Sequence, residues 1–145
     1  MTLAARAVQP SQPCPCGRLS LSKKPLPLAD CCGRFIDHFE DMPAPDAETL
    51  MRSRYTAFVL ERADYLLATW HVSRRPQAID FEAGVKWIGL EVRQHRVQDA
   101  THAEVEFVAR QKSPGTAAVR LHERSRFLKD GDVPGRWYYV DGDLL

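Results

Sequence analysis

Residues 46–61, DAETLMRSRYTAFVLE, predict an amphipathic helix. Asp46 suits the N-cap, and Glu48 in the first turn interacts favourably with the helix dipole. A second run with helical spacing follows almost at once and must end before Pro76. The two runs therefore predict one kinked helix or a pair of helices. Their apolar positions are Ala47, Leu50, Met51, Tyr55, Phe58 and Val59 in the first run and Ala63, Leu66, Leu67 and Trp70 in the second.

The sequence changes character from Lys86 onward. Val, Phe, Trp and Tyr recur with a period of two, and turn-forming stretches separate the runs. Short connections favour an antiparallel meander, because parallel neighbours need crossovers of a dozen or more residues. The predicted fold class is therefore α+β, with N-terminal helices followed by a curved antiparallel sheet that packs over them. We expect the strands at about residues 86–98, 103–111, 117–129 and 136–141.

Length and composition limit the class of protein. A chain of 145 residues with 44% hydrophobic content is long enough for one core of ordinary size, so we expect one main domain with an appendage. Lysine and arginine number 20 against 19 acidic residues, which gives a net charge of +1. No overall field therefore draws the chain to nucleic acid or to an anionic membrane.

The sequence predicts neither membrane insertion nor secretion. Its longest apolar stretches, such as residues 56–60, are far shorter than the roughly 20 residues of a membrane-spanning helix. Residues 1–8 contain one arginine and no apolar run of the kind found in secretory signals. We expect a cytoplasmic protein.

Prolines divide the N-terminal part of the chain. Pro10 and Pro13 disfavour a helix, so residues 1–13 predict a loosely ordered tail. Pro43 and Pro45 restrict the residues before them to extended conformations. We place the boundary of the main domain here, which gives a cysteine-containing segment at 1–40 and a main domain at 46–145.

All the cysteines lie in the N-terminal segment. Cys14 and Cys16 are one residue apart at a turn, and Cys31 and Cys32 are adjacent. In a reducing compartment such crowding favours metal binding over a disulfide framework, and four thiolates complete a tetrahedral zinc site. The alternative is two reduced or adventitiously oxidised pairs without a metal.

Two groups of motifs resemble known families. CPCG at 14–17 and CCG at 31–33 resemble the SEC-C motif, a small zinc knob found at the end of the bacterial translocation ATPase SecA and in many other proteins. Six further stretches resemble the bacterial YchJ family: LMRSRYTAF at 50–58, ADYLL with TWH over 63–71, WIGL at 87–90, VEFVA at 105–109, ERSRF at 123–127 and WYYVDG at 137–142. The resemblance implies a cone similar to nuclear transport factor 2 or cystatin, a zinc site, and no particular activity.

The chain departs from the SEC-C pattern in the length of one loop. Fourteen residues separate Cys16 from Cys31, where the motif has roughly eight. The longer loop costs only about 0.5 kcal/mol in closure entropy, against a zinc-binding free energy on the order of 10 kcal/mol. The alternative is that Pro25 and Pro27 direct the second cysteine pair away from the first.

Two charged residues occupy positions where apolar side chains are expected. Arg54 lies in the middle of the apolar helical stripe. Glu123 shares one face of the third strand with Leu121, Ser125 and Phe127, the face that should meet the helices. We expect a buried ion pair between them, either as a structural link or as the polar floor of a ligand pocket. The pocket candidates are Arg54, Tyr55, Trp70, His71, Glu123 and Ser125.

Further polar residues admit a functional and a structural interpretation. Arg120, His122, Arg124 and Arg126 form a basic strip on the other face of the third strand. A solvated strip neutralised by Glu104 and Glu106 is favoured over a phosphate site. His71 suits the end of the second helix, where a cationic ring is favourable, better than the role of a catalytic base.

Three functions remain open. The favoured one is a non-enzymatic binding module or adaptor, whose cone holds a small molecule or protein segment while the knob docks on a protein partner. The second is a small enzyme that uses His71, Glu123, Arg54 and Tyr55. The third is association with ribosomes or nucleic acid through Lys23 and Lys24 of the long loop, which the balanced charge disfavours. Both a monomer and a homodimer are compatible with the sequence.

Overall fold

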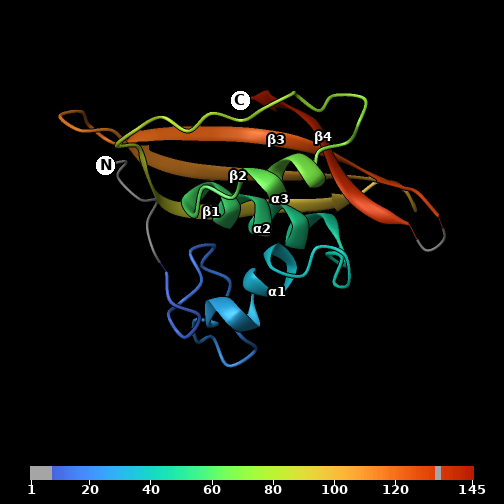
Figure 1. Cartoon of the computed structure of the whole chain (residues 1–145), viewed down its shortest axis with the longest axis horizontal. Coiled ribbons are helices and arrows are strands. Elements are labelled where there is room, and N and C mark those ends of the chain that lie inside the picture. Colours follow the sequence, from blue (N-terminus) through green and yellow to red (C-terminus); the bar gives the residue numbers. More distant parts are fainter. Residues whose placement is uncertain (1–7, 133–134) are drawn as a thin grey trace.

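Helices and a single sheet form two layers in the structure, a computed structural model that describes residues 8–132 and 135–145. The sheet has the order β1-β2-β3-β4, and all neighbouring strands are antiparallel. Helices α2 (Ala47–Val59) and α3 (Ala63–Ala68) cover one of its faces (Figure 1). The predicted α+β meander is confirmed. The strands are β1 (Lys86–Val97), β2 (His102–Lys112), β3 (Val119–Asp130) and β4 (Arg136–Leu144).

Helix α2 has well-defined ends. Asp46 is extended, and its carboxylate accepts a hydrogen bond from the Thr49 backbone N–H at 2.7 Å, as expected of an N-cap. The helix gives way at Leu60, and Glu61 adopts a positive φ of 52°, a conformation that breaks helical geometry. The two helical runs of the sequence are therefore a pair of helices and not one kinked helix.

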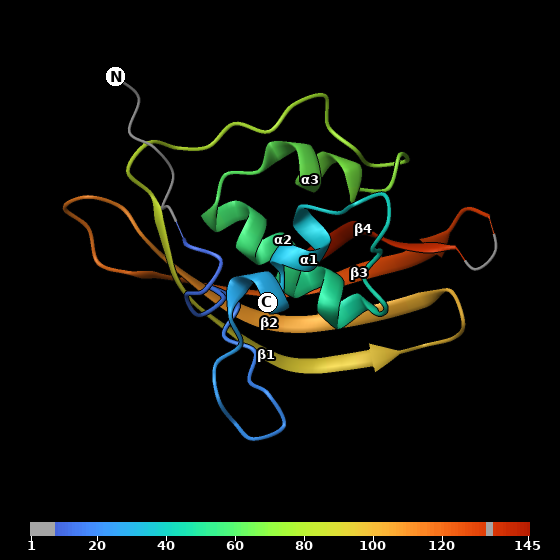
Figure 2. The same cartoon turned by 60° about the horizontal axis from the view of Figure 1, so that its bottom comes forward.

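Strand register puts the predicted face of β3 toward the helices. Val105 pairs with Ser125, and Phe107 pairs with Glu123, so these side chains share the inner face of the sheet. Irregularities in β1 and between Arg126 and Phe127 interrupt the ladders, and such bulges bend strands. The sheet curves around α2 (Figure 2).

Ion pairs engage three of the four residues of the basic strip on the outer face of β3, namely His122, Arg124 and Arg126. Of the two partners expected from the sequence, Glu106 takes part, whereas Glu104 accepts a hydrogen bond from Gln98 instead. His122 contacts Glu106 at 2.8 Å. Arg126 contacts Asp141 at 2.6 Å and Asp143 at 2.7 Å. These last two acids come from β4, which extends three residues beyond the predicted end at 141. The pairing agrees with a solvated structural strip.

The N-terminal segment lies on the side of α2 away from the strands (Figure 1). It contains the short elements η1 (Leu28–Asp30) and α1 (Gly33–Ile36). Residues 1–7 of the predicted loose tail lie outside the described residues, but Pro10 and Gln12 accept hydrogen bonds from the η1 backbone at 3.0 and 2.8 Å. The expectation of a loose tail is therefore wrong for this part. None of the helices in the described ranges has the length and apolar character needed to cross a membrane.

Candidate metal centre and cavity

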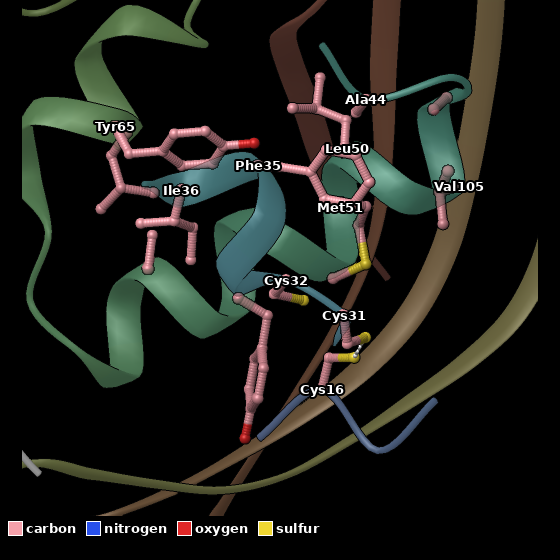
Figure 3. Packing of buried hydrophobic residues seen from close by; sticks show 14 of the residues in the cluster. Cys16, Cys31, Cys32, Phe35, Ile36, Ala44, Leu50, Met51, Tyr65 and Val105 are labelled. Atoms are coloured by element: carbon pink, nitrogen blue, oxygen red, sulfur yellow. Dashed lines mark hydrogen bonds between the residues drawn. The ribbon is translucent and has the colours of Figure 1, made fainter. Parts of the chain in front are cut away.

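The four cysteine sulfurs converge on one point. Cys14 and Cys16 flank a turn that Gly17 closes with a φ of 75°, and Cys31 and Cys32 lead into α1. All four sulfurs lie within 4.8 Å of one another, and those of Cys16 and Cys31 are 3.6 Å apart. Figure 3 shows three of these residues meeting below Met51. The cluster is one four-membered group and not two separate pairs.

The long loop between the cysteine pairs folds back on itself, which explains why its length does not separate them. Isolated bridges join Pro13 to Pro27 and Leu19 to Pro25. The Cys14 backbone N–H donates to the Leu26 carbonyl at 2.8 Å. The two prolines therefore lie in a narrow ribbon that returns the chain to its starting point, and the alternative in which they divert Cys31 and Cys32 is wrong.

The distances in the cluster fit a tetrahedral thiolate metal site. A Zn–S bond of about 2.3 Å places the sulfurs of a regular tetrahedron about 3.8 Å apart. The observed separations bracket this value, and all four residues are at least nine-tenths buried. The Arg18 backbone N–H points to the Cys16 sulfur at 3.5 Å, a contact that suits a thiolate.

The four thiols shift one another's pKa values in different directions. Hydrogen bonds with Cys16 and then with Cys31 and Cys32 lower the pKa of Cys14. The same interactions, led by those with Cys14 and Cys16, raise the pKa of Cys32. Because a metal is bound by thiolates, a divalent cation would release the remaining thiol protons.

Polar contacts fix the cysteine cluster to helix α2. Arg52 donates to the Cys16 carbonyl at 3.1 Å and to Glu48 at 2.8 Å. The Thr56 hydroxyl lies 3.6 Å from the Cys14 sulfur. These anchors were not expected from the sequence, although the four-residue spacing of Glu48 and Arg52 is the usual signal of an ion pair on a helix.

A cavity of about 190 Å³ lies between α2 and the inner face of the sheet. Aromatic rings form most of its wall, and Arg54, Glu123 and Ser125 supply polar atoms. Its lining residues are Met51, Arg54, Tyr55, Phe58, Trp70, Trp87, Phe107, Ala109, Leu121, Glu123, Ser125, Phe127 and Tyr139. Five of the six residues proposed from sequence as a pocket therefore border one space; His71 does not.

Arg54 is held by neutral groups. Its Nη1 atom donates to the Leu66 carbonyl and to the Thr69 hydroxyl, both at 2.7 Å. The guanidinium also lies over the rings of Trp70 and Tyr139, at 5.2 and 4.6 Å from their centroids. Burial lowers the pKa of Arg54 to about 10, so the side chain remains a cation at neutral pH.

The predicted ion pair between Arg54 and Glu123 is wrong. No salt bridge within 4.0 Å joins them in the described part of the chain, because each side chain turns to other partners. Glu123 accepts a short hydrogen bond from the Ser125 hydroxyl. Its Oε2 atom also lies 2.7 Å from where a Cβ at Gly142 would be, so only glycine leaves room for it there. The two charges border one cavity without touching.

His71 lies outside the cavity and beyond the end of α3. Its ring contacts Asp130 and Ser73, both at 2.7 Å. Trp70 pairs with Tyr139 in an isolated bridge, and successive residues of an extended segment point to opposite sides. Trp70 therefore faces inward and His71 outward, where its ring contacts Asp130 and not the end of the helix. His71 does not line the cavity.

The comparisons with known proteins extend over nearly the whole chain. A family model described as "YchJ, middle NTF2-like domain" matches residues 46–142. A UPF0225 protein of Polaromonas sp. strain JS666 is 72% identical, and the alignment covers 94% of this chain and 96% of that protein. A UPF0225 protein of Methylibium petroleiphilum is 56% identical, with 91% and 88% covered.

Two solved structures share the fold. The crystal structure of a SEC-C motif containing protein from Psychrobacter arcticus has a TM-score of 0.77 at 33% identity, covering 91% of this chain and 82% of that one. The solution structure of a SEC-C motif containing protein from Rhodopseudomonas palustris has a TM-score of 0.74 at 31% identity, covering 92% and 99%. The resemblance noted from the sequence is confirmed.

Proposed function

The chain belongs to the YchJ family, and we propose that it is a non-enzymatic, zinc-containing binding protein that holds a small, mainly apolar ligand in its cone. The observation that carries this proposal is the cavity between α2 and the sheet, with one cation and one carboxylate on an otherwise aromatic wall. Apolar pockets with a few well-placed polar groups are the usual form of small-molecule sites.

The zinc site has a structural role in this proposal. Four protein ligands close the coordination sphere, and closed thiolate sites stabilise folds, whereas catalytic zinc keeps a position open. Arg52 and Thr56 join the cluster to α2, and the same helix carries Arg54 and Tyr55 to the cavity. Zinc would therefore fix the helix that forms one wall of the binding site.

The enzyme alternative has less support. Among the lining residues Glu123 is the only carboxylate and none is a histidine. Of the two tyrosines in the lining, Tyr55 and Tyr139, the pKa of Tyr139 is raised to about 12 by burial and then by the nearby Glu123 carboxylate. General acid–base catalysis at neutral pH favours groups with a pKa near 7. The cavity is better suited to binding than to proton transfer.

Indole N–H resonances offer a direct test of binding. Trp70 and Trp87 line the cavity, whereas Trp137 is buried outside it and serves as an internal reference. Titration with benzyl alcohol, followed by NMR, should shift the Trp70 and Trp87 signals much more than the Trp137 signal. Equal small shifts of all three signals would contradict a cavity site.

A cavity-filling variant provides the control for that titration. Ala109 lines the cavity, so Ala109→Leu should abolish the shifts while keeping or raising the melting temperature, as substitutions that fill a cavity commonly do. Ala117 is exposed before β3, and Ala117→Leu adds the same atoms away from the cavity. Binding that survives Ala109→Leu as fully as Ala117→Leu would overturn the proposal.

A further inference from the structure

The two charges in the cavity suggest what kind of ligand belongs between them. Arg54 is 6% exposed and Glu123 is half-buried, and both border the same aromatic space without forming an ion pair. Opposite charges taken out of water normally pair directly, because desolvation without a partner is costly. Arg54 and Glu123 are separated across the cavity, so a ligand group between them could contact both side chains.

Arg54 lines the cavity and has hydrogen-bonding capacity beyond its bonds to Leu66 and Thr69. A guanidinium has five N–H groups, and the bonds to Leu66 and Thr69 both use the Nη1 nitrogen. Within the described residues no hydrogen bond is assigned to Nε or Nη2, and the guanidinium borders the open space. Parallel N–H groups of this kind form the fork that binds a carboxylate.

Glu123 offers the complementary group on the sheet side. Ser125 donates to its Oε2 atom, and the absence of a side chain at Gly142 leaves space for that oxygen. No hydrogen bond is assigned to Oε1 among the described residues. An ionised carboxylate only accepts hydrogen bonds, so its ligand partner must be a donor, and an ammonium group gives the strongest attraction.

The rest of the cavity limits the size of the ligand. An apolar cavity of about 150 Å³ holds benzene, so 190 Å³ accommodates one ring or a branched chain with a short polar head. The rings of Phe58, Trp87 and Phe107 supply the apolar wall away from the charges. A dipeptide or a fused-ring cofactor exceeds this space.

We infer that the ligand is a zwitterion with one small apolar body, the chemistry of an aromatic or branched-chain α-amino acid. This inference rests on the proposed binding function. The ligand carboxylate binds the Arg54 fork, and its ammonium group binds Glu123. A carboxylate alone would face Glu123 without a compensating charge, and an amine alone would face Arg54, so each is bound more weakly than the zwitterion.

Four phenyl compounds separate these possibilities. L-Phenylalanine, 3-phenylpropionate, phenethylamine and 2-phenylethanol carry the same ring with a zwitterionic, anionic, cationic or neutral head. The dissociation constant of each is measured by the Trp70 and Trp87 indole shifts of the full-length zinc-loaded protein. We expect L-phenylalanine to bind at least about tenfold more tightly than the other three, because each of them leaves one charge without a partner.

Conservative variants test which residue binds the ammonium group of the ligand and which binds its carboxylate. Glu123→Gln should remove the preference for L-phenylalanine over 3-phenylpropionate, whereas Glu106→Gln, on the outer face of the same sheet, should keep it. Arg54→Lys keeps the charge and loses the fork, so the preference over phenethylamine should fall.

Failure of the zwitterion inference and failure of the proposed binding function give different experimental results. Equal affinity for L-phenylalanine and 2-phenylethanol would overturn the zwitterion while leaving the binding function intact. A preference for L-phenylalanine that survives Glu123→Gln would also overturn it. Absence of Trp70 and Trp87 shifts with all four compounds and with benzyl alcohol would overturn both proposals together.

Discussion

The cysteine cluster and the cavity occupy different faces of helix α2. The cluster brings its polar atoms together, whereas the cavity keeps its two charged groups apart. At the cluster, four sulfurs lie close enough to share protons or one metal ion. In the cavity, Arg54 and Glu123 are held apart across an aromatic space. The cluster suits a single cation, whereas the cavity has room for a larger group. This contrast supports the proposal of a structural metal site on one face of the helix and a ligand site on the other.

One helix connects the two regions. Thr49, Arg52 and Thr56 reach the N-terminal segment, and Met51, Arg54 and Phe58 line the cavity. The cysteines and α2 belong to one continuous buried cluster. A change at the cysteines should therefore reach the cavity through α2, while a change inside the cavity should leave the metal in place.

Replacing a cysteine should have the largest effect. Cys16→Ser removes a soft ligand, and structural zinc contributes on the order of 10 kcal/mol in small domains. We expect loss of the metal and a melting temperature lower by about 10 °C, corresponding to about 3 kcal/mol or more. Calorimetry and metal analysis measure both. Thr56→Ala, which removes only the hydroxyl near Cys14, should retain the metal, and equal losses in the two variants would contradict a metal site.

Removing the two cavity charges should have unequal effects. Arg54→Leu leaves the Leu66 carbonyl without its donor, and an unsatisfied buried group costs about 1 to 3 kcal/mol. Glu123→Gln keeps an acceptor for Ser125 and should cost less than about 1 kcal/mol. Urea denaturation measures the difference. Losses of about 3 to 5 kcal/mol in both variants would instead indicate the direct ion pair that the sequence suggested.

The N-cap of α2 provides a smaller test that changes the stability of the helix and leaves both of its faces intact. Asp46→Ala removes the bond to the Thr49 N–H and should lower the free energy of unfolding by about 1 kcal/mol. Asp46→Asn keeps a capping oxygen and should remain close to the unmodified protein. Metal content and the Trp70 signal should stay unchanged in both, and loss of either would show that the end of the helix matters more than its two faces.

Acid should weaken the outer face of the sheet by the smallest amount. Contact with His122, and then with Arg124, lowers the pKa of Glu106 below its ordinary value of 4.5. A carboxylate whose pKa is lower in the folded than in the unfolded state stabilises the fold at pH values above its unfolded-state pKa. This contribution is lost as the pH falls through the folded-state pKa. Urea midpoints at pH 7, 5, 4 and 3 should therefore decline below about pH 4.5.

Acid also releases zinc from thiolates, so the decline needs a reference protein. Glu106→Gln lacks the titrating group and keeps the cysteines. Its stability should be lower than that of the unmodified protein at pH 7, and the difference should shrink as the pH falls. A constant difference across this range would contradict the role assigned to Glu106.

The elements with a strong local pattern could be predicted from the sequence. The apolar period of α2, the alternation in the strands and the spacing of the cysteines are local, and the structure agrees with all three. The inner face of β3 was also predicted, because alternation fixes which residues lie beside Ser125 and Phe127.

The direction of individual side chains could not be predicted. Arg54 and Glu123 do lie on facing surfaces, but their partners depend on the end of α3 and on Gly142 in β4, which are distant in sequence. The outward turn of His71 follows from a bridge between Trp70 and Tyr139 that no local pattern reveals. The return of the long loop likewise depends on hydrogen bonds across it, such as that from Cys14 to Leu26.

Native mass spectrometry of the freshly isolated, reduced protein is the most direct test of the central claim that four cysteines hold one ion and thereby fix α2. We expect a single zinc per chain, which a strong chelator removes and which is absent when Cys14, Cys16, Cys31 and Cys32 are all replaced by serine. A chain that carries no metal and melts at the same temperature with and without its cysteines would show that the four residues hold no ion.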